Sequence, residues 1–142
     1  MNKIFIDANI LIDLVDEKRV NHKKVIEIFE YLIDKNIEIY TSCDLMTTIY
    51  YIINKHSKID GLDVISQINN ICVIIPFSND EVEFVIKMMK EDKLFKDFED
   101  TLQFYLAKKL EVDCILSNDK GFYSPDIEIL NVEKFYQKME LK

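Results

Sequence analysis

The sequence predicts an α/β domain in which helices flank a central, mostly parallel sheet. Short apolar runs alternate along the chain with longer segments whose apolar residues recur at helical spacing, the pattern of strand–helix–strand units. Only 2 glycines and 2 prolines interrupt this alternation. A chain of 142 residues is long enough to bury one core, so we expect residues 1–142 to form a single domain.

The stretch from Lys3 to Leu14 predicts a buried strand that leads directly into a helix. Its first residues are apolar, Asp7 then introduces a charge, and the apolar residues after it follow helical spacing. In open α/β sheets ligands bind beyond the carboxyl ends of the strands, where Asp7 is expected to lie. Aspartates also cap helices. The segment alone leaves both interpretations of Asp7 open.

The next elements are a helix, a strand and two further helices. Apolar residues at helical spacing predict an amphipathic helix over 21–35, and the run 37–41 predicts a short strand. Ser42 or Asp44 is expected to cap the following helix. A helix around 62–68 is expected to pack against it, which gives a hairpin of helices.

The second half of the chain continues the alternation. The run Ile71–Ile75 is the clearest buried strand, and Pro76 closes it. The remaining predicted elements are helices near 82–89, 100–110 and 132–139 and strands at 114–117 and 127–130.

The net charge of −8 argues against a protein that binds nucleic acid through a general basic surface. A metal-dependent nuclease stays compatible with this charge, because bound cations neutralise carboxylates inside a site. Basic residues form two local clusters, which we interpret as solvated helix faces in preference to phosphate-binding patches. The first consists of Lys18, Arg19, His22, Lys23 and Lys24, and the second of Lys87, Lys90, Lys93 and Lys96.

Acidic residues occur at three places that one α/β site would bring together. Asp7 follows the first strand, Asp97 and Asp100 open a helix, and Asp119 follows the strand at 114–117. At a helix start an acid such as Asp97 also has a structural interpretation, because it answers the helix dipole. Converging carboxylates repel one another unless a cation is bound, and oxygen ligands select hard ions such as Mg²⁺ or Mn²⁺. Such a site suits hydrolysis of a phosphodiester by activated water.

Two segments of the chain resemble the PIN domain, and within that family the VapC-type toxin ribonucleases. They are FIDANILIDL near the start and DFEDTLQFYLAKKLEVDCILSNDKGF in the second half. The resemblance covers nearly the full length and implies a three-layer, Rossmann-like domain. It also implies an Mg²⁺- or Mn²⁺-dependent endoribonuclease with an RNA substrate, frequently a homodimer and often held inactive by a cognate antitoxin.

The resemblance assigns roles to four acidic residues. Asp7, Asp100 and Asp119 match the family's acidic positions and are expected to be the metal ligands. Asp97 matches an additional aspartate in the D-F-E-D version of the motif, which makes it the fourth member of the expected catalytic set.

Three polar positions complete the comparison with the family pattern. Asn9 and Ser117 match polar positions that often support the site. The family usually has a glutamate in the context S-x-x-T-x-x-E, and here the segment SCDLMTT places Thr48 at that position. A hydroxyl binds a metal-bound water but supplies no charge, and the nearest acid, Asp44, is interpreted as a helix cap. The alternative function is therefore a PIN-like module that binds RNA or protein with weak or no catalysis.

The expected cellular location follows from the absence of membrane-spanning runs and signal-peptide features in this sequence. Its apolar runs are too short to cross a bilayer, and its first residues lack the apolar core and cleavage site of a signal peptide. We therefore expect a cytoplasmic protein with no membrane contact. Three cysteines stand far apart without metal-ligand spacing and are expected to be free thiols.

Overall fold

A computed structural model of the protein, which describes residues 1–140, has the three-layer α/β arrangement that the sequence predicts. Five strands form one sheet in the order β3-β2-β1-β4-β5, and every neighbouring pair is parallel. The carboxyl ends of all five strands therefore lie at the same edge of the sheet. The strands are β1 (Lys3–Ile6), β2 (Glu38–Ser42), β3 (Val73–Ile75), β4 (Cys114–Leu116) and β5 (Glu128–Leu130).

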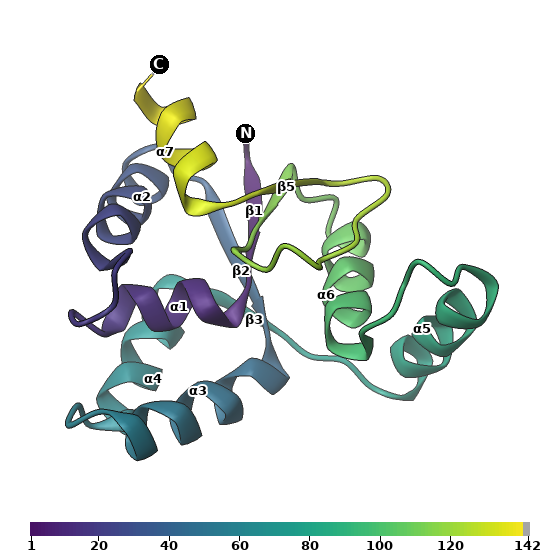
Figure 1. Ribbon diagram of the computed structural model, residues 1–142, viewed down its shortest axis with the longest axis horizontal. Coiled ribbons are helices and arrows are strands. Elements are labelled where there is room, and N and C mark those ends of the chain that lie inside the picture. The colour runs from purple at the N-terminus through teal and green to yellow at the C-terminus, as the bar shows by residue number, and fades with distance from the viewer. Residues whose placement is uncertain (141–142) are drawn as a thin grey trace.

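Helices cover both faces of this sheet (Figure 1). Two separate groups of buried side chains, one on each face, form the core. The larger group lies under α1 (Ala8–Val15), α2 (His22–Asp34), α3 (Cys43–His56), α4 (Gly61–Ile71) and α7 (Val132–Glu140). The smaller group lies under α5 (Asn79–Glu91) and α6 (Phe98–Lys109).

Strand β1 lies at the centre of the sheet, and its side chains alternate between the two groups. Ile4 and Ile6 belong to the larger group, whereas Phe5 packs with Phe104 of α6 in the smaller one. None of these three β1 side chains is exposed to solvent. A parallel strand that is covered on both faces has a continuous apolar sequence. The apolar run at the start of the chain therefore predicts this strand.

The order of the connections marks the ligand-binding end of the sheet. From β1 the chain moves outward through β2 to β3, and it then returns to β4 on the opposite side of β1. The reversal makes the carboxyl ends of β1 and β4 a topological switch point, the place where open α/β sheets bind ligands. The backbone N–H of Asp7 donates to the carbonyl of Leu116 at 3.1 Å, which fixes the two strand ends side by side.

The prediction of a buried strand at 71–75 is wrong in two respects. Ile71 belongs to α4, and the strand begins only at Val73. β3 also lies at the edge of the sheet and pairs with β2 alone, so the Val73 side chain is 50% exposed. An apolar run predicts a strand, but it does not distinguish a central strand from an edge strand.

The expected cap of α3 also differs. Ser42 is the N-cap residue by position, but its side chain makes no capping hydrogen bond to the helix. Its hydroxyl instead donates to the carboxylate of Asp44, which lies in the first turn of the helix. The interpretation of Asp44 as the cap is therefore wrong, and its carboxylate faces the end of β2.

The remaining predictions on the chain as a whole concern membranes and thiols. Within residues 1–140 no helix combines the length and the apolarity that a bilayer crossing requires. Cys43, Cys72 and Cys114 are free, as predicted. Burial raises the pKa of Cys72 and of Cys114 to about 12, so both remain protonated core residues at neutral pH.

Candidate functional site

Asp7 occupies the carboxyl end of the central strand, and both interpretations of it apply. As the N-cap of α1, it accepts the N–H of Ala8 on Oδ1 at 2.7 Å. Its other oxygen, Oδ2, accepts the hydroxyl of Ser117 at 2.7 Å. The residue is only 5% exposed, and burial raises its pKa. The two hydrogen bonds and one from Gln103 oppose that rise, whereas the charge of Asp119 adds to it.

Ser117 connects Asp7 to the turn that follows β4. Its buried hydroxyl donates to Asp7 and accepts the backbone N–H of Asp119 at 3.1 Å. Asp119 in turn accepts the N–H of Gly121 on Oδ1 at 2.9 Å, which shapes the turn. The structure therefore places Asp119 beside Asp7 through one shared serine, Ser117, which lies 110 positions after Asp7 in the sequence.

Asp97 and Asp100 lie at the start of α6. Asp97 is the N-cap, and its Oδ1 accepts the N–H of Asp100 at 2.9 Å. The carboxylate of Asp100 is partly buried, and its pKa is raised to about 7. Burial is the largest cause, followed by the charges of Asp97 and Asp119, a hydrogen bond with Asp119, and the charge of Asp7. Burial and the acidic neighbours thus favour the protonated form of Asp100, which is the behaviour of crowded carboxylates.

The structure also brings together groups that the sequence interpretation did not assign to the site. Glu99 has a raised pKa because of partial burial and the charges of Asp44, Asp7 and Asp97. Gln103, one turn further along α6, donates from Nε2 to Glu99 Oε1 at 3.5 Å and hydrogen-bonds Asp7. Its side chain is completely buried, and within residues 1–140 its Oε1 has no hydrogen-bond partner.

A sequence signal for Gln103 exists in its spacing. It follows Asp100 by three positions and Glu99 by four, so the three side chains occupy one face of the helix. The glutamine also interrupts a run of residues that are otherwise buried and largely apolar, from Leu102 to Ala107.

The other two expected supporting residues are both exposed. Asn9 is exposed on α1, where it lines a hollow together with Lys18 and Asn118. Thr48 is exposed on α3, one turn after Asp44. Asp44 is the α3 residue whose charge raises the pKa of Glu99, so the start of α3 faces the start of α6.

The residues present fit a hard divalent cation in charge and in chemistry. Asp7, Asp97, Asp100 and Asp119 offer only oxygen ligands, and none of them forms an ion pair with a basic side chain of residues 1–140. In the same part of the chain no three acidic, histidine or cysteine side chains stand in the arrangement of a completed metal site. The carboxylates are thus electrostatic neighbours that share unbalanced negative charge without converging on one point.

The sequence and the fold are similar to those of known proteins. Residues 3–121 match the family model of the PIN domain. Ribonuclease VapC1 of Aquifex aeolicus (strain VF5) is 48% identical over 136 residues, which are 96% of this chain and 94% of the relative.

Two solved structures extend the comparison to the fold. VapBC2 from Rickettsia felis, bound to a DNA fragment from their promoter, matches with a TM-score of 0.69 and 18% identity over 91% of this chain and 98% of that chain. VapC20 of Mycobacterium tuberculosis, a toxin that cleaves the sarcin-ricin loop, matches with a TM-score of 0.67 and 15% identity over 84% and 92%. At these identities the two structures show a shared fold.

Proposed function

The chain belongs to the PIN domain family and is a homologue of a VapC ribonuclease, and on this premise we propose that it is a divalent-metal-dependent endoribonuclease. The observation that carries the proposal is the linkage of Asp7, Ser117 and Asp119 at the switch point of the sheet, with the carboxyl group of Asp100 hydrogen-bonded to Asp119. Four carboxylates that have no basic partner among residues 1–140 form a site for cation-assisted chemistry on a phosphate.

Asp7, Asp100 and Asp119 are the residues that would hold Mg²⁺ or Mn²⁺. The chemistry that such an ion supplies is activation of water near neutral pH and neutralisation of charge on phosphate oxygens. Ser117 orients Asp7 through its hydroxyl, and Gln103 holds the same carboxylate from the side of α6. Asp97 positions Asp100 through the cap of the helix and adds negative charge beside it.

The biological role that we propose is that of the toxin in a toxin–antitoxin pair. The support comes from the relative that is a VapC ribonuclease and from a structural neighbour that is a VapBC assembly. A cognate antitoxin is accordingly the expected protein partner, and a homodimer is the expected assembly. The 48% identity with a ribonuclease favours this role over a PIN-like binding module without catalysis.

Cleavage of a labelled RNA pool tests the proposal. Protein purified free of any antitoxin is expected to cleave single-stranded RNA when Mn²⁺ or Mg²⁺ is added, and to lose this activity when a chelator is added. Cleavage that continues in excess chelator would contradict the metal dependence. Intact RNA at every metal concentration would favour the binding module.

A further inference from the structure

Two polar hollows flank the acidic residues at the switch point. The first, of 470 Å³, lies between α1 and the loop after it and includes Asn9, Lys18 and Arg19. The second, of 290 Å³, lies beyond β4 and includes Ser117, Asp119, Lys120 and Lys134. Asn118 lines both of them, so the hollows meet beside Asp119.

The charge in these hollows is opposite to that of the whole chain. In the first, Lys18 and Arg19 face one acid, Asp13, and in the second two lysines face Asp119 alone. Each hollow thus carries one more basic than acidic side chain, although the chain has a net charge of −8. A basic surface within an acidic protein attracts a polyanion locally without promoting general binding to nucleic acid.

Contacts with Asp13 of α1 hold the loop that lines the first hollow. Arg19 Nε donates to Oδ1 of Asp13 at 2.8 Å, and Asp13 is only 4% exposed. His22 Nδ1 lies 2.8 Å from the carbonyl of Asp13. A guanidinium has five N–H donors, and this ion pair uses one of them. The sequence interpretation of Lys18 and Arg19 as part of a helix face is wrong, because both lie between the end of α1 and the start of α2.

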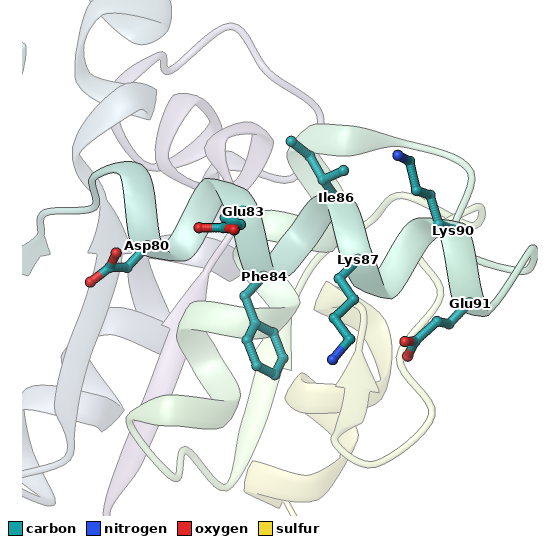
Figure 2. A pocket seen from close by; sticks show the side chains of 7 residues that line it. All are labelled: Asp80, Glu83, Phe84, Ile86, Lys87, Lys90 and Glu91. Atoms are coloured by element: carbon teal, nitrogen blue, oxygen red, sulfur yellow. The ribbon is translucent and has the colours of Figure 1, made fainter.

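Two lysines of the second basic cluster, Lys87 and Lys90, lie on α5. Figure 2 shows that Lys87 and Glu91 extend from α5 on the same side as the ring of Phe84, whereas Lys90 extends from the other side; Asp80 and Glu83 line the same hollow as these residues. Acids outnumber lysines in this hollow of 580 Å³, and all its lining residues come from one helix. The interpretation as a solvated helix face fits Lys87 and Lys90, which therefore serve as controls.

We propose that the two hollows are one track for the sugar-phosphate backbone of the RNA substrate, which passes the acidic site at Asn118. Lys18 and Arg19 would contact a phosphate on one side of the cleaved bond, and Lys120 and Lys134 a phosphate on the other. Contacts of this kind position a nucleic acid without reading its sequence. The inference rests on the proposed function, because it names how the substrate of that same site is held.

The test measures binding of a fluorescein-labelled single-stranded RNA by anisotropy in the presence of Mg²⁺. All proteins carry Asp100→Asn, so that RNA is retained and not consumed. Lys18→Glu and Lys134→Glu are the test substitutions, and neither lysine forms an ion pair within residues 1–140. Lys87→Glu and Lys90→Glu change the charge equally on α5.

The double variant of the track is expected to bind RNA on the order of tenfold more weakly than its parent. Each track substitution is also expected to lower the slope of log affinity against log salt by about 1, with the same loss for RNAs of different sequence. The α5 substitutions are expected to leave the slope close to that of the parent. An equal loss in both pairs of variants would overturn the track, because general charge would then explain binding.

The failure of the track and the failure of the function are separable. A parent that binds RNA while the Lys18 and Lys134 variants bind equally well overturns only the track. A parent that fails to bind any RNA overturns the proposed function together with the track. Displacement of the RNA by an equal charge concentration of polyglutamate would also overturn the track, because the surface would then be a site for an acidic protein segment.

Discussion

The carboxylate of Asp7 is held on both oxygens, by the N–H of Ala8 and the hydroxyl of Ser117. Its orientation is therefore set by the end of β1 and the end of β4 before any ligand is bound. For Asp100, burial and, after it, the charges of Asp97 and Asp119 raise the pKa to about 7. Hydrogen bonds thus fix the orientation of Asp7, whereas burial and acidic neighbours favour the protonated form of Asp100.

The raised pKa of Asp100 predicts a pH dependence of stability in the presence of a chelator. Between the ordinary value of 3.8 and about 7 the folded protein binds a proton that the unfolded chain has released. This contribution to stability is complete below the unfolded pKa and is lost as the pH rises through the folded pKa. We expect the melting temperature of the wild type to fall more steeply than that of Asp100→Asn as the pH rises to about 8.

At about pH 8 the Asp100→Asn variant is accordingly expected to be the more stable protein, because it removes a buried charge. Thermal unfolding of both proteins across the pH range measures this difference. Asp7 and Glu99, whose pKa values are also raised, act in the same direction in both proteins and cancel in the comparison. Parallel melting curves for the two proteins would show that Asp100 has an ordinary pKa.

The second prediction at the scale of single residues concerns Thr48. It lies one turn after Asp44 on the exposed side of α3. The charge of Asp44 is one of the causes of the raised pKa of Glu99 on α6. Thr48→Glu adds the carboxylate that the family pattern has there and is expected to raise metal-dependent cleavage on the order of tenfold above a weak wild-type rate. Thr47→Glu is the control, because it adds the same charge to the neighbouring position on a different side of the helix. Equal rates in wild type and Thr48→Glu would mean that the missing charge has no consequence.

The places of the acidic residues at strand and helix ends could be predicted from the sequence, because each lies next to a clear change in apolar spacing. Asp7 and Asp119 follow apolar strands, and Asp97 and Asp100 precede an apolar helix. The spacing of Glu99 and Gln103 puts both on one face of α6 with Asp100, but only the structure shows that this face turns toward Asp7. A buried glutamine has no apolar periodicity of its own, and only the packed structure shows its unpaired oxygen.

At the scale of elements, α6 begins with a cap that is also a site residue. Asp97→Ala removes the side chain that accepts the N–H of Asp100 and is expected to cost about 1 kcal/mol of unfolding free energy. Asp97→Asn retains an acceptor but removes the charge, so it is expected to keep most of the stability while lowering the pKa of Asp100. Urea unfolding of the two variants separates the roles. A loss of stability of equal size in both would show that charge, and not the capping hydrogen bond, stabilises the helix start.

The elements themselves were predictable wherever the apolar period was clear. The order and type of all strands and helices follow the sequence pattern, and the differences lie in their surroundings. The run before Pro76 is an edge strand, because the chain leaves the sheet after β3 and returns beyond β1. Lys18 and Arg19 lie in a loop because α1 ends at Val15, a boundary that charge patterning does not mark. Strand order and helix ends depend on long-range packing, which a local pattern does not contain.

At the scale of the whole molecule, the unbalanced carboxylates predict that a cation stabilises the fold. A ligand that binds only the folded state stabilises it by mass action, by about 2.7 kcal/mol at a concentration of 100 times its Kd. We expect millimolar Mg²⁺ or Mn²⁺ to raise the melting temperature of the wild type and to raise that of Asp7→Asn by much less. Asp7→Asn is also expected to be the more stable of the two in chelator, because repulsion is relieved. A wild type that does not respond to either ion would contradict cation binding by these carboxylates.

The central claim is that the acids at the switch point cleave RNA with a bound divalent ion. It is tested most directly by incubating a labelled RNA pool with wild type, Asp100→Asn and the matched control Asp80→Asn, whose carboxylate lies on α5 away from the site. All three proteins must be purified identically and free of any antitoxin. We predict that wild type and Asp80→Asn cleave the RNA in the presence of Mn²⁺ and that Asp100→Asn leaves it intact. Cleavage of equal extent by Asp100→Asn would contradict the account, since the activity would then come from outside this site.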